Sequence, residues 1–355
     1  MKGLILSGGT GSRLQPLTHT LPKQLIPIAN RPVLCYIIDA LQHAGIDEIG
    51  IIVSDKKELI KKKIEKEHLP GVKLTYIVQD APLGLAHAVK TARPFLGKSD
   101  FVMVLGDNLF EEGLDKALKI FAEGRFDAVV FLIPVDEPQR FGVAEVKDGR
   151  IISLAEKPAN PRSNLAIMGI YIFRETIFPA INRISFSERG ELEITDAIQQ
   201  LINMGGRVAT YMFSGWWLDI GRPEDVLAAN RMMLSSLSRK SKKGLFTERL
   251  SQNCFVTPSS LISGSILQGP LIIGENCRVA DSYIGPFTSI GNGSFVEGSA
   301  LEGSILLENV SIRRVEGIIL NSIVGEGTEI SGRDSLQNGM KSKTFLLGAK
   351  SRIYL

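Results

Sequence analysis

The sequence predicts an α/β protein in which a Rossmann-like domain with a mostly parallel sheet is followed by a left-handed parallel β-helix. Short apolar runs alternate with segments of helical period up to about residue 238, which is typical of parallel α/β sheets. Beyond residue 254, an aliphatic residue recurs at nearly every sixth position, which is typical of hexapeptide β-helices. We expect the first domain at residues 1–238, a linker at 239–247 and the β-helix at 248–355.

The elements of the first domain follow from its apolar periodicity. The runs at 4–6 and 101–105 are apolar throughout, as expected for strands buried on both faces. We also expect strands at 49–53, 74–78 and 129–134 and within 141–174, and helices at 33–44, 55–67, from 85, at 195–204 and at 223–238. Loops that follow parallel strands lie at the carboxyl edge of the sheet, where such sheets bind ligands. The loops after residues 6, 78 and 105 are therefore expected to converge.

The β-helix is predicted from the spacing of its aliphatic residues, which would fill the axis of the coil. A polar hinge, SRKSKKG at 238–244, precedes it. Small residues four positions after an aliphatic–glycine pair would occupy the corners: Cys277, Thr288, Ser294 and Thr328. The predicted inward positions are Phe255, Leu261, Leu267, Ile273, Val279, Ile284, Ile290, Val296, Leu306, Ile312, Ile318, Val324 and Ile330.

Composition excludes several classes of protein. The formal net charge is +3, with 41 basic and 38 acidic side chains among 355 residues, so no global field indicates nucleic acid. The charged segment 55–67 pairs opposite charges four residues apart, which indicates a solvated helix. Cys35, Cys254 and Cys277 are odd in number and widely spaced, which favours a reducing, cytoplasmic location. We expect no signal peptide and no membrane span, since no apolar run approaches about 18 residues.

The loop after the first strand has the residue types of a phosphate-binding site. Gly8, Gly9 and Gly11 allow the backbone to turn and to present bare N–H groups to an anion. Arg13 and Lys23 add full positive charges. The spacing matches neither a P-loop nor a dinucleotide fingerprint. A plain glycine turn is the alternative, although the preceding strand and the two cations favour a phosphate cradle.

The motifs of the first 235 residues resemble those of the sugar-nucleotidyltransferases, also called nucleoside-diphosphate-sugar pyrophosphorylases. The resemblance rests on an ordered set: GGTGSRLQPLT, PKQLIPIANRPVL, QDAPLGLAHA, VLGDN, FGVAEV, AEKP, RGELEITD and WLDIG. The Lys-Gln-Leu at 23–25 is similar to the glucose-1-phosphate thymidylyltransferase branch in its long form. The resemblance implies transfer of a thymidylyl group from dTTP to glucose 1-phosphate with Mg²⁺, in a homo-oligomer.

The resemblance also implies the residues that carry this chemistry. The catalytic set would be Arg13, Lys23, Asp107, Lys157 and Asp219, with Asp107 and Asp219 holding Mg²⁺. The nucleotide would contact Gly8, Gly9, Gly11, Ser12, Arg13, Gln79, Pro82, Gly84 and Asp107. The sugar phosphate would contact Gly142, Glu156, Lys157 and Gly169. A strand-end aspartate is otherwise a helix cap or a turn residue.

Other interpretations of these residues stay open. Glu156 could be a surface ion-pair partner of Lys157, and Glu193 and Asp196 are equally consistent with a helix cap or with support of the site. The family's short members usually have tyrosine where this chain has Phe141, so the hydroxyl group of that tyrosine is missing here.

The four histidines, His19, His43, His68 and His87, have no ligand spacing and favour ordinary surface or core roles. Residues 244–355 contain no histidine, the base that many β-helix acyltransferases use. We therefore expect the β-helix to serve stacking or assembly, or to be a lost second enzyme. The alternatives to the thymidylyltransferase are an enzyme that uses UTP or another hexose 1-phosphate and a non-catalytic regulatory homologue.

Overall fold

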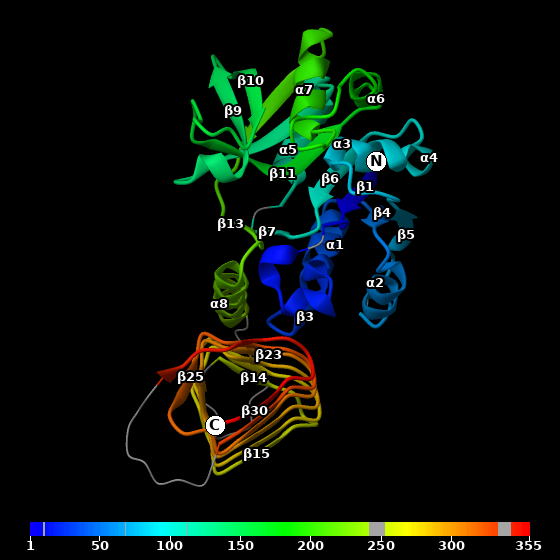
Figure 1. Ribbon diagram of the computed structural model, residues 1–355. Helices are drawn as coiled ribbons and strands as arrows, with labels where there is room; N and C mark the ends of the chain where they lie inside the picture. Colours follow the sequence, from blue (N-terminus) through cyan, green and yellow to red (C-terminus); the bar gives the residue numbers. More distant parts are fainter. Residues whose placement is uncertain (10, 68, 112, 241–252, 333–341) are drawn as a thin grey trace. The chain divides into compact units, whose positions relative to one another are not determined.

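The computed structural model describes all residues except 10, 68, 112, 241–252 and 333–341, and it divides into two compact units (Figure 1). The first unit comprises Met1–Gly9 and Val33–Asp219, and the second comprises Thr10–Pro32 and Ile220–Leu355. The segment that follows the first glycines therefore belongs to the unit that contains the β-helix. Among the described residues, no helix has the length and apolar character needed to cross a membrane.

The first unit is a nine-stranded sheet covered by helices. Its path runs β10-β9-β11-β6-β1-β4-β5, while β8 pairs with β11 and β12 pairs with β8. The strands are β1 Lys2–Leu6, β4 Glu48–Val53, β5 Lys73–Val78, β6 Phe101–Leu105, β8 Ala128–Pro134, β9 Gly142–Lys147, β10 Arg150–Glu156, β11 Leu165–Phe173 and β12 Val208–Met212. The helices are α1 Val33–His43, α2 Lys57–Ile64, α3 Leu85–Thr91, α4 Arg93–Leu96, α5 Asp115–Gly124, α6 Ile177–Ile181 and α7 Ile194–Asn203.

The predicted parallel sheet is confirmed in its central part. Strands β6, β1, β4 and β5 are all parallel neighbours, and β1 is buried from its second residue onward. The sheet becomes mixed beyond β6, because β11 runs antiparallel to β6, β8 and β9. The carboxyl ends of β1, β5 and β6 nevertheless share one edge, as the sequence predicts. In α2, the expected pair Lys61–Glu65 is present at 3.8 Å.

The second unit contains the predicted β-helix, built from three stacks of short parallel strands. One stack is β14 Cys254–Val256, β17 Leu271–Ile273, β20 Ser289–Ile290, β23 Ile305–Leu306, β26 Ile323–Val324 and β29 Leu346–Leu347. The next is β15 Leu261–Ser263, β18 Arg278–Ala280, β21 Phe295–Glu297, β24 Ser311–Arg313, β27 Glu329–Ser331 and β30 Arg352–Tyr354. The third is β16 Ile266–Leu267, β19 Tyr283–Ile284, β22 Ala300–Glu302, β25 Ile318–Leu320 and β28 Ser342–Lys343.

Ten of the thirteen predicted axial positions belong to the buried core of this β-helix. The predictions at 255, 261 and 318 are wrong by one residue: Val256, Ile262 and Ile319 occupy those inward positions, and Leu261 is 70% exposed. Register explains the error, because Ile262 pairs with Val279 and Ile319 pairs with Leu301. The predicted corner residues Cys277, Thr288, Ser294 and Thr328 are all buried.

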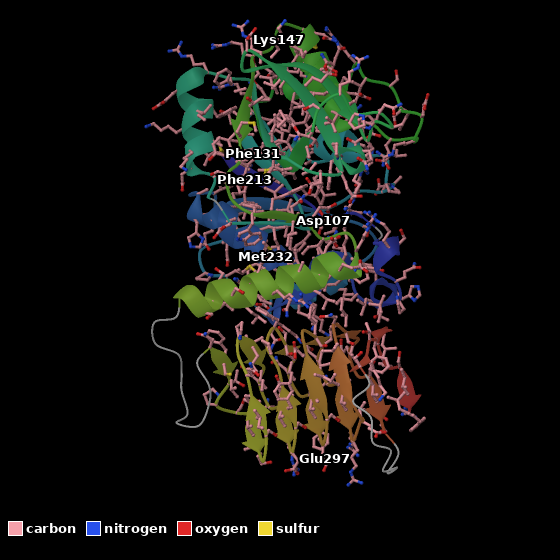
Figure 2. All side chains as sticks on the ribbon, turned by 90° about the vertical axis from the view of Figure 1, so that its left-hand side faces the viewer. Asp107, Phe131, Lys147, Phe213, Met232 and Glu297 are labelled. Atoms are coloured by element: carbon pink, nitrogen blue, oxygen red, sulfur yellow. The ribbon has the colours of Figure 1, made fainter. Side chains whose placement is uncertain are left out.

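Helix α8, Pro223–Lys240, lies in the second unit and is two residues longer than predicted. Ser238 to Lys240 are therefore helical rather than part of a hinge, and the rest of the predicted hinge lies outside the described residues. Most of the predicted linker at 239–247 also lies outside the described residues. The boundary between the two predicted domains therefore stays a prediction. Figure 2 shows α8, which carries Met232, lying across one end of the β-helix strands, with Glu297 toward their other end.

A buried asparagine on α8 joins three parts of the second unit. The side-chain oxygen of Asn230 accepts from the Ala29 N–H at 2.8 Å and from the Ser289 hydroxyl at 2.8 Å. Its amide nitrogen donates to the Phe287 carbonyl at 3.0 Å. Ala29 lies at the turn between β2 Pro27–Ile28 and β3 Arg31–Pro32, with a φ of 47°, which costs a non-glycine residue energy. Asn230 therefore holds a strained hairpin against the β-helix.

Asn230→Ala is expected to destabilise the protein by about 1–3 kcal/mol, because it leaves buried donors and an acceptor without partners. Chemical denaturation measures this change. The control is Asn203→Ala at the exposed end of α7, where a change within about 0.5 kcal/mol is expected. Equal stability of the Asn230 variant and the wild type would contradict this role.

Candidate active site

The loops after β1 and β5 meet at Gln79. A Cβ atom added to Gly8 would lie 3.1 Å from the Gln79 side-chain oxygen. The Gln79 amide nitrogen donates to the Gly84 carbonyl at 3.3 Å and lies 3.0 Å from His87 Nδ1. The structure thus brings together Gly8, Gln79 and Gly84, as expected from sheet topology. Pro82 is exposed on the same loop, with no contact to the other predicted residues among the interactions described.

The Gly84 backbone requires glycine. Its φ is 99°, and a Cβ there would lie 2.5 Å from the Leu192 carbonyl oxygen. The Ala86 N–H donates to that carbonyl, and the Leu192 N–H donates to the Leu83 carbonyl. Because the loop is tied on both sides to Leu192, the QDAPLG and RGELEITD motifs, far apart in sequence, form one structure.

The two predicted metal ligands lie on one short ladder. β6 ends at Leu105, and Asp107 follows directly before β7 Asn108–Phe110. β7 pairs antiparallel with β13 Trp217–Asp219, and Asp219 is the register partner of Asn108. Asp107 is buried, with 8% of its surface exposed. Asp219 therefore lies across the ladder from the residue that follows Asp107, although the two aspartates are 112 positions apart in sequence.

Side chains around this ladder fix its position. The Trp217 indole N–H donates to the Asn108 side-chain oxygen at 2.9 Å. The Phe141 ring lies 5.2 Å from the Trp217 ring, so the phenylalanine that replaces the expected tyrosine packs beside the aspartate ladder. A Cβ on Gly169 would lie 2.5 Å from Leu105 and 2.8 Å from the Asn108 amide nitrogen. Gly169, with a φ of 74°, therefore permits close approach of β11 to this strand end.

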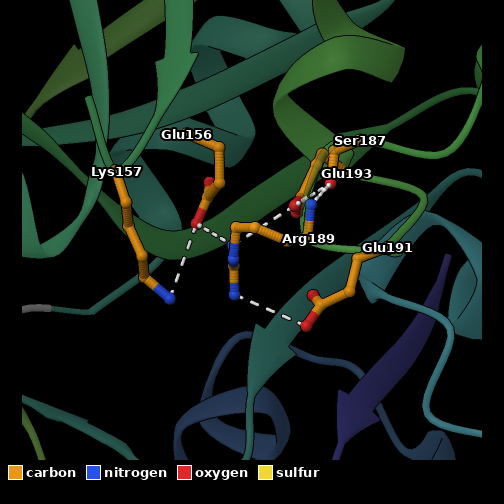
Figure 3. A network of polar contacts seen from close by, with 6 residues as sticks. All are labelled: Glu156, Lys157, Ser187, Arg189, Glu191 and Glu193. Carbon is orange, nitrogen blue, oxygen red and sulfur yellow. Dashed lines mark hydrogen bonds and ion pairs between the residues drawn. The ribbon is translucent and has the colours of Figure 1, made fainter. Parts of the chain in front are cut away.

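A network of charges surrounds Glu156 (Figure 3). Glu156 pairs in register with Gly142, where a Cβ would lie 3.0 Å from its carboxylate. Lys157 Nζ lies 3.7 Å and Arg189 Nη1 lies 3.4 Å from the same carboxylate oxygen. Lys157 has a φ of 43°, an uncommon backbone conformation for a non-glycine residue that is frequent at functional sites. The sequence left open whether Glu156 forms an ion pair with Lys157. The structure contains this ion pair, and Arg189 lies beside Glu156 as a second cation.

Arg189 connects three carboxylates in this network. Besides Glu156, it contacts Glu191 at 3.4 Å and Glu193 at 3.2 Å. Ser187 donates to Glu193 at 2.9 Å. Glu193 is the residue before α7 and makes no capping hydrogen bond with its side chain, so its role as a plain helix cap is not observed. Arg189 stands in the RGELEITD motif but was not among the predicted site residues.

Burial controls the ionisation of the carboxylates here. Burial raises the pKa of Glu156, and the Lys157 and Arg189 cations only partly oppose this effect. Burial also raises the pKa of Glu193, against the hydrogen bond from Ser187 and the Arg189 charge. The pKa of Asp196 on α7 is raised by burial as well. These acids take up protons at a higher pH than ordinary carboxyl groups do.

The second unit holds the cations of the first loop. Gly11 has a φ of 67°, and a Cβ there would lie 3.0 Å from Thr18 and 3.3 Å from Lys23. The Thr18 hydroxyl donates to the Gly11 carbonyl at 2.8 Å, which folds the loop so that Lys23, in the 3-10 helix Lys23–Leu25, lies beside Gly11. Arg13, in the 3-10 helix Ser12–Leu14, lies against Gly221, where a Cβ would be 3.1 Å from its guanidinium.

The chain leaves the first unit after Gly9 and again after Asp219.

The histidines among the described residues differ from one another: His43 is exposed and contacts the Asp39 carbonyl, whereas His87 contacts Gln79. His68 lies outside the described residues.

The donor set of the aspartate ladder suits magnesium. Mg²⁺ prefers hard oxygen ligands and is usually held by one or two carboxylates together with substrate phosphates and waters. Among the described residues there is no group of three or more histidine, cysteine or acidic side chains that could hold a metal. The described residues therefore contain no closed set of protein ligands like that of a structural zinc site. The carboxylates of Asp107 and Asp219 fit a metal ion that is also bound by a substrate.

The first unit combines an α/β sheet, a glycine-containing loop after β1, aspartates near strand ends and the cations beside Glu156, which is typical of enzymes for phosphorylated substrates. The chain belongs to the Nucleotidyl transferase family, whose model matches residues 2–236, and it is a sugar-phosphate nucleotidyltransferase. The nucleotidyltransferase Agl11 of low-salt glycan biosynthesis in Haloferax volcanii is 42% identical over 362 residues and covers 100% of both chains. The glucose-1-phosphate thymidylyltransferase of Streptomyces griseus is 42% identical over 358 residues and covers 99% of both.

A solved structure shows the same fold. It is a Bacillus anthracis protein described as a glucose-1-phosphate thymidylyltransferase in complex with sucrose, with 36% identity and a TM-score of 0.62. The match covers 65% of this chain and 94% of that one. The resemblance stated from the motifs is thereby confirmed at the level of the family.

Proposed function

We propose that the enzyme transfers a thymidylyl group from dTTP to glucose 1-phosphate, giving dTDP-glucose and pyrophosphate. The observation that carries this proposal is the register pairing of Asp219 with Asn108, which joins the VLGDN and WLDIG motifs beside Gly169 and Phe141. A full-length relative named for this reaction supports it.

The triphosphate would bind at the first loop. Gly8, Gly9, Gly11 and Ser12 would offer backbone N–H groups, and Arg13 and Lys23 would supply charge. The reaction brings two anions together, so the protein must suppress their repulsion and hold them in line. Each charge-assisted contact contributes about 1.5–3 kcal/mol. Asp107 and Asp219 would hold Mg²⁺, which when bound neutralises charge on the triphosphate.

The sugar phosphate would bind at the network around Glu156. Lys157 and Arg189 would contact the phosphate, while Glu156 would accept from sugar hydroxyls and Gly142 would leave room for the hexose. In the structure, Arg189 pairs with the Glu156 carboxylate. An incoming phosphate would attract Arg189 and leave this carboxylate available to the sugar. The phosphate oxygen then attacks the α-phosphorus in line, and pyrophosphate leaves with the P–O bond electrons, so no enzyme nucleophile is required.

Gln79 and Gly84 would bind the nucleobase. A primary amide matches the imide edge of thymine or uracil, and Gly84 lets the backbone approach. The 5-methyl group of thymine is worth about 0.8 kcal/mol, or roughly fourfold. We therefore expect the enzyme to prefer dTTP while accepting UTP.

Glu156→Gln is expected to lower kcat/KM for glucose 1-phosphate about tenfold and to flatten its pH dependence. The wild-type carboxylate must be ionised to accept strongly from hydroxyls, and burial raises its pKa. Wild-type KM for glucose 1-phosphate should therefore rise as the pH falls through the raised pKa of Glu156. This rise should begin at a higher pH than it would with an ordinary carboxyl group. The neutral amide loses about 1.4 kcal/mol of charge-assisted bonding and has no such transition.

Initial rates between pH 5 and 8 measure both effects. Glu123→Gln, at an exposed position on α5, should keep the wild-type profile. If KM for glucose 1-phosphate still rose at low pH in the Glu156→Gln enzyme, a group other than Glu156 would be responsible for the pH dependence.

The proposed function is tested by pyrophosphate release with dTTP, UTP, GTP and CTP, each against several hexose 1-phosphates, with Mg²⁺ present or chelated. We expect the highest kcat/KM with dTTP and glucose 1-phosphate, and no turnover with EDTA. A higher rate with UTP or with another hexose would support the closest alternative, and a purine preference would overturn the base assignment. No turnover with any pair would favour the non-catalytic homologue.

A further inference from the structure

Both hydrogen-bond donors of the Gln79 amide are occupied within the protein. The amide nitrogen carries two N–H groups; one faces the Gly84 carbonyl at 3.3 Å and the other faces His87 Nδ1 at 3.0 Å. The side-chain oxygen lies on the opposite side, toward Gly8. Gln79 is half-buried at the end of β5, and His87 is half-buried in the first turn of α3.

The Gly84 carbonyl and His87 each favour one orientation of the Gln79 amide. A carbonyl oxygen can only accept, so the amide directs its nitrogen to Gly84 at 3.3 Å. The His87 nitrogen that faces the same amide nitrogen must then be the unprotonated acceptor of a neutral imidazole. The opposite amide orientation would place two oxygens against each other at Gly84. His87 and Gly84 therefore favour a single orientation, which leaves the Gln79 oxygen as the group open to a ligand.

We propose that His87 is a positioning residue that makes Gln79 present only an acceptor to the nucleobase, and so selects bases with an imino N–H. This inference rests on the proposed function. Thymine and uracil carry N3–H and can donate to the Gln79 oxygen, whereas cytosine has an unprotonated N3 at the same place. Cytosine would be rejected because two acceptors would face each other, and an unpaired polar group in a binding site is costly.

The test compares UTP with CTP, which differ in this hydrogen-bonding edge and share the same sugar. His87→Leu removes one of the two acceptors that hold the Gln79 amide nitrogen, so turning this nitrogen toward cytosine costs less than in the wild type. The UTP-to-CTP ratio of kcat/KM is expected to fall about three- to tenfold, the value of one hydrogen bond. His87→Asn should restore most of the ratio, because an asparagine oxygen can accept where Nδ1 does. His43→Leu, on the exposed end of α1, should leave the ratio unchanged.

The outcomes are distinguishable from failure of the proposed function. If the wild type shows no activity with pyrimidine triphosphates, the proposed function fails and the ratio has no meaning. If the wild type prefers UTP over CTP and His87→Leu keeps the same ratio while remaining folded by circular dichroism, the role of His87 is overturned. A merely structural role would lower activity with both triphosphates by the same factor and would also overturn it.

Discussion

Asp107→Asn is expected to lower kcat by about 10²–10³-fold while the protein stays folded. The substitution keeps the size of a side chain that is 8% exposed at the end of β6, but it removes one of two carboxylates proposed to hold Mg²⁺. Loss of the charge stabilisation that a metal supplies costs several kcal/mol, and each 1.4 kcal/mol is tenfold in rate. Single-turnover pyrophosphate release at the Mg²⁺ concentration that suffices for the wild type measures the change.

The Asp107 prediction has a matched control in Asp148→Asn. Asp148 is exposed and has a φ of 50°, a conformation that asparagine also tolerates, so its rate should equal that of the wild type. Raising Mg²⁺ concentration should partly restore the Asp107 variant. Near-normal turnover of Asp107→Asn at ordinary Mg²⁺ would remove this residue from the metal role.

Lys23→Met is expected to lower kcat/KM for dTTP about 10- to 150-fold. Methionine keeps a long flexible stem but has no charge, so the variant loses one charge-assisted contact of about 1.5–3 kcal/mol. Lys23 lies beside Gly11, whose backbone conformation positions the loop. Because negative charge shifts onto the leaving pyrophosphate in the transition state, more of the loss should appear in kcat than in KM.

Steady-state rates with varied dTTP separate these two parameters. Lys147→Met, at the exposed end of β9 (Figure 2), is the control and should behave as the wild type. A Lys23 variant with unchanged kcat and a raised KM would show that the lysine binds the ground state and the transition state equally strongly.

The architecture could be predicted from the sequence because its two periodicities are strong. The alternation of strand-like and helix-like segments predicted the parallel core of the sheet, and the six-residue spacing of aliphatic residues predicted the β-helix. The antiparallel half of the sheet was not predictable, since an apolar run such as β11 carries no information on strand direction. Positions 261 and 318 were misplaced because Ile262 and Ile319 are equally aliphatic neighbours, and only pairing with the adjacent coil selects between them.

The candidate site was predictable where a motif marks a strand end, as for Asp107 and Gln79. The contact between Asp219 and the β6 end required the β7–β13 ladder, which links residues far apart in sequence. Arg189 was missed for the same reason, because Glu156 is 33 positions away. His87 was assigned an ordinary role because its spacing to Gln79, eight positions away, matches no known ligand pattern. An arginine followed by two alternating glutamates was the available signal for Arg189. The domain boundaries, the homo-oligomer and the roles of the individual site residues stay predictions.

A crystal structure of the enzyme with dTDP-glucose and Mg²⁺ tests most directly whether one site unites these residues. We expect the base at Gln79 and Gly8, the two phosphates near Arg13, Lys23 and the metal on Asp107 and Asp219, and the hexose at Gly142 and Glu156. Product bound away from the N-terminal glycines, or a metal held by other residues, would contradict it.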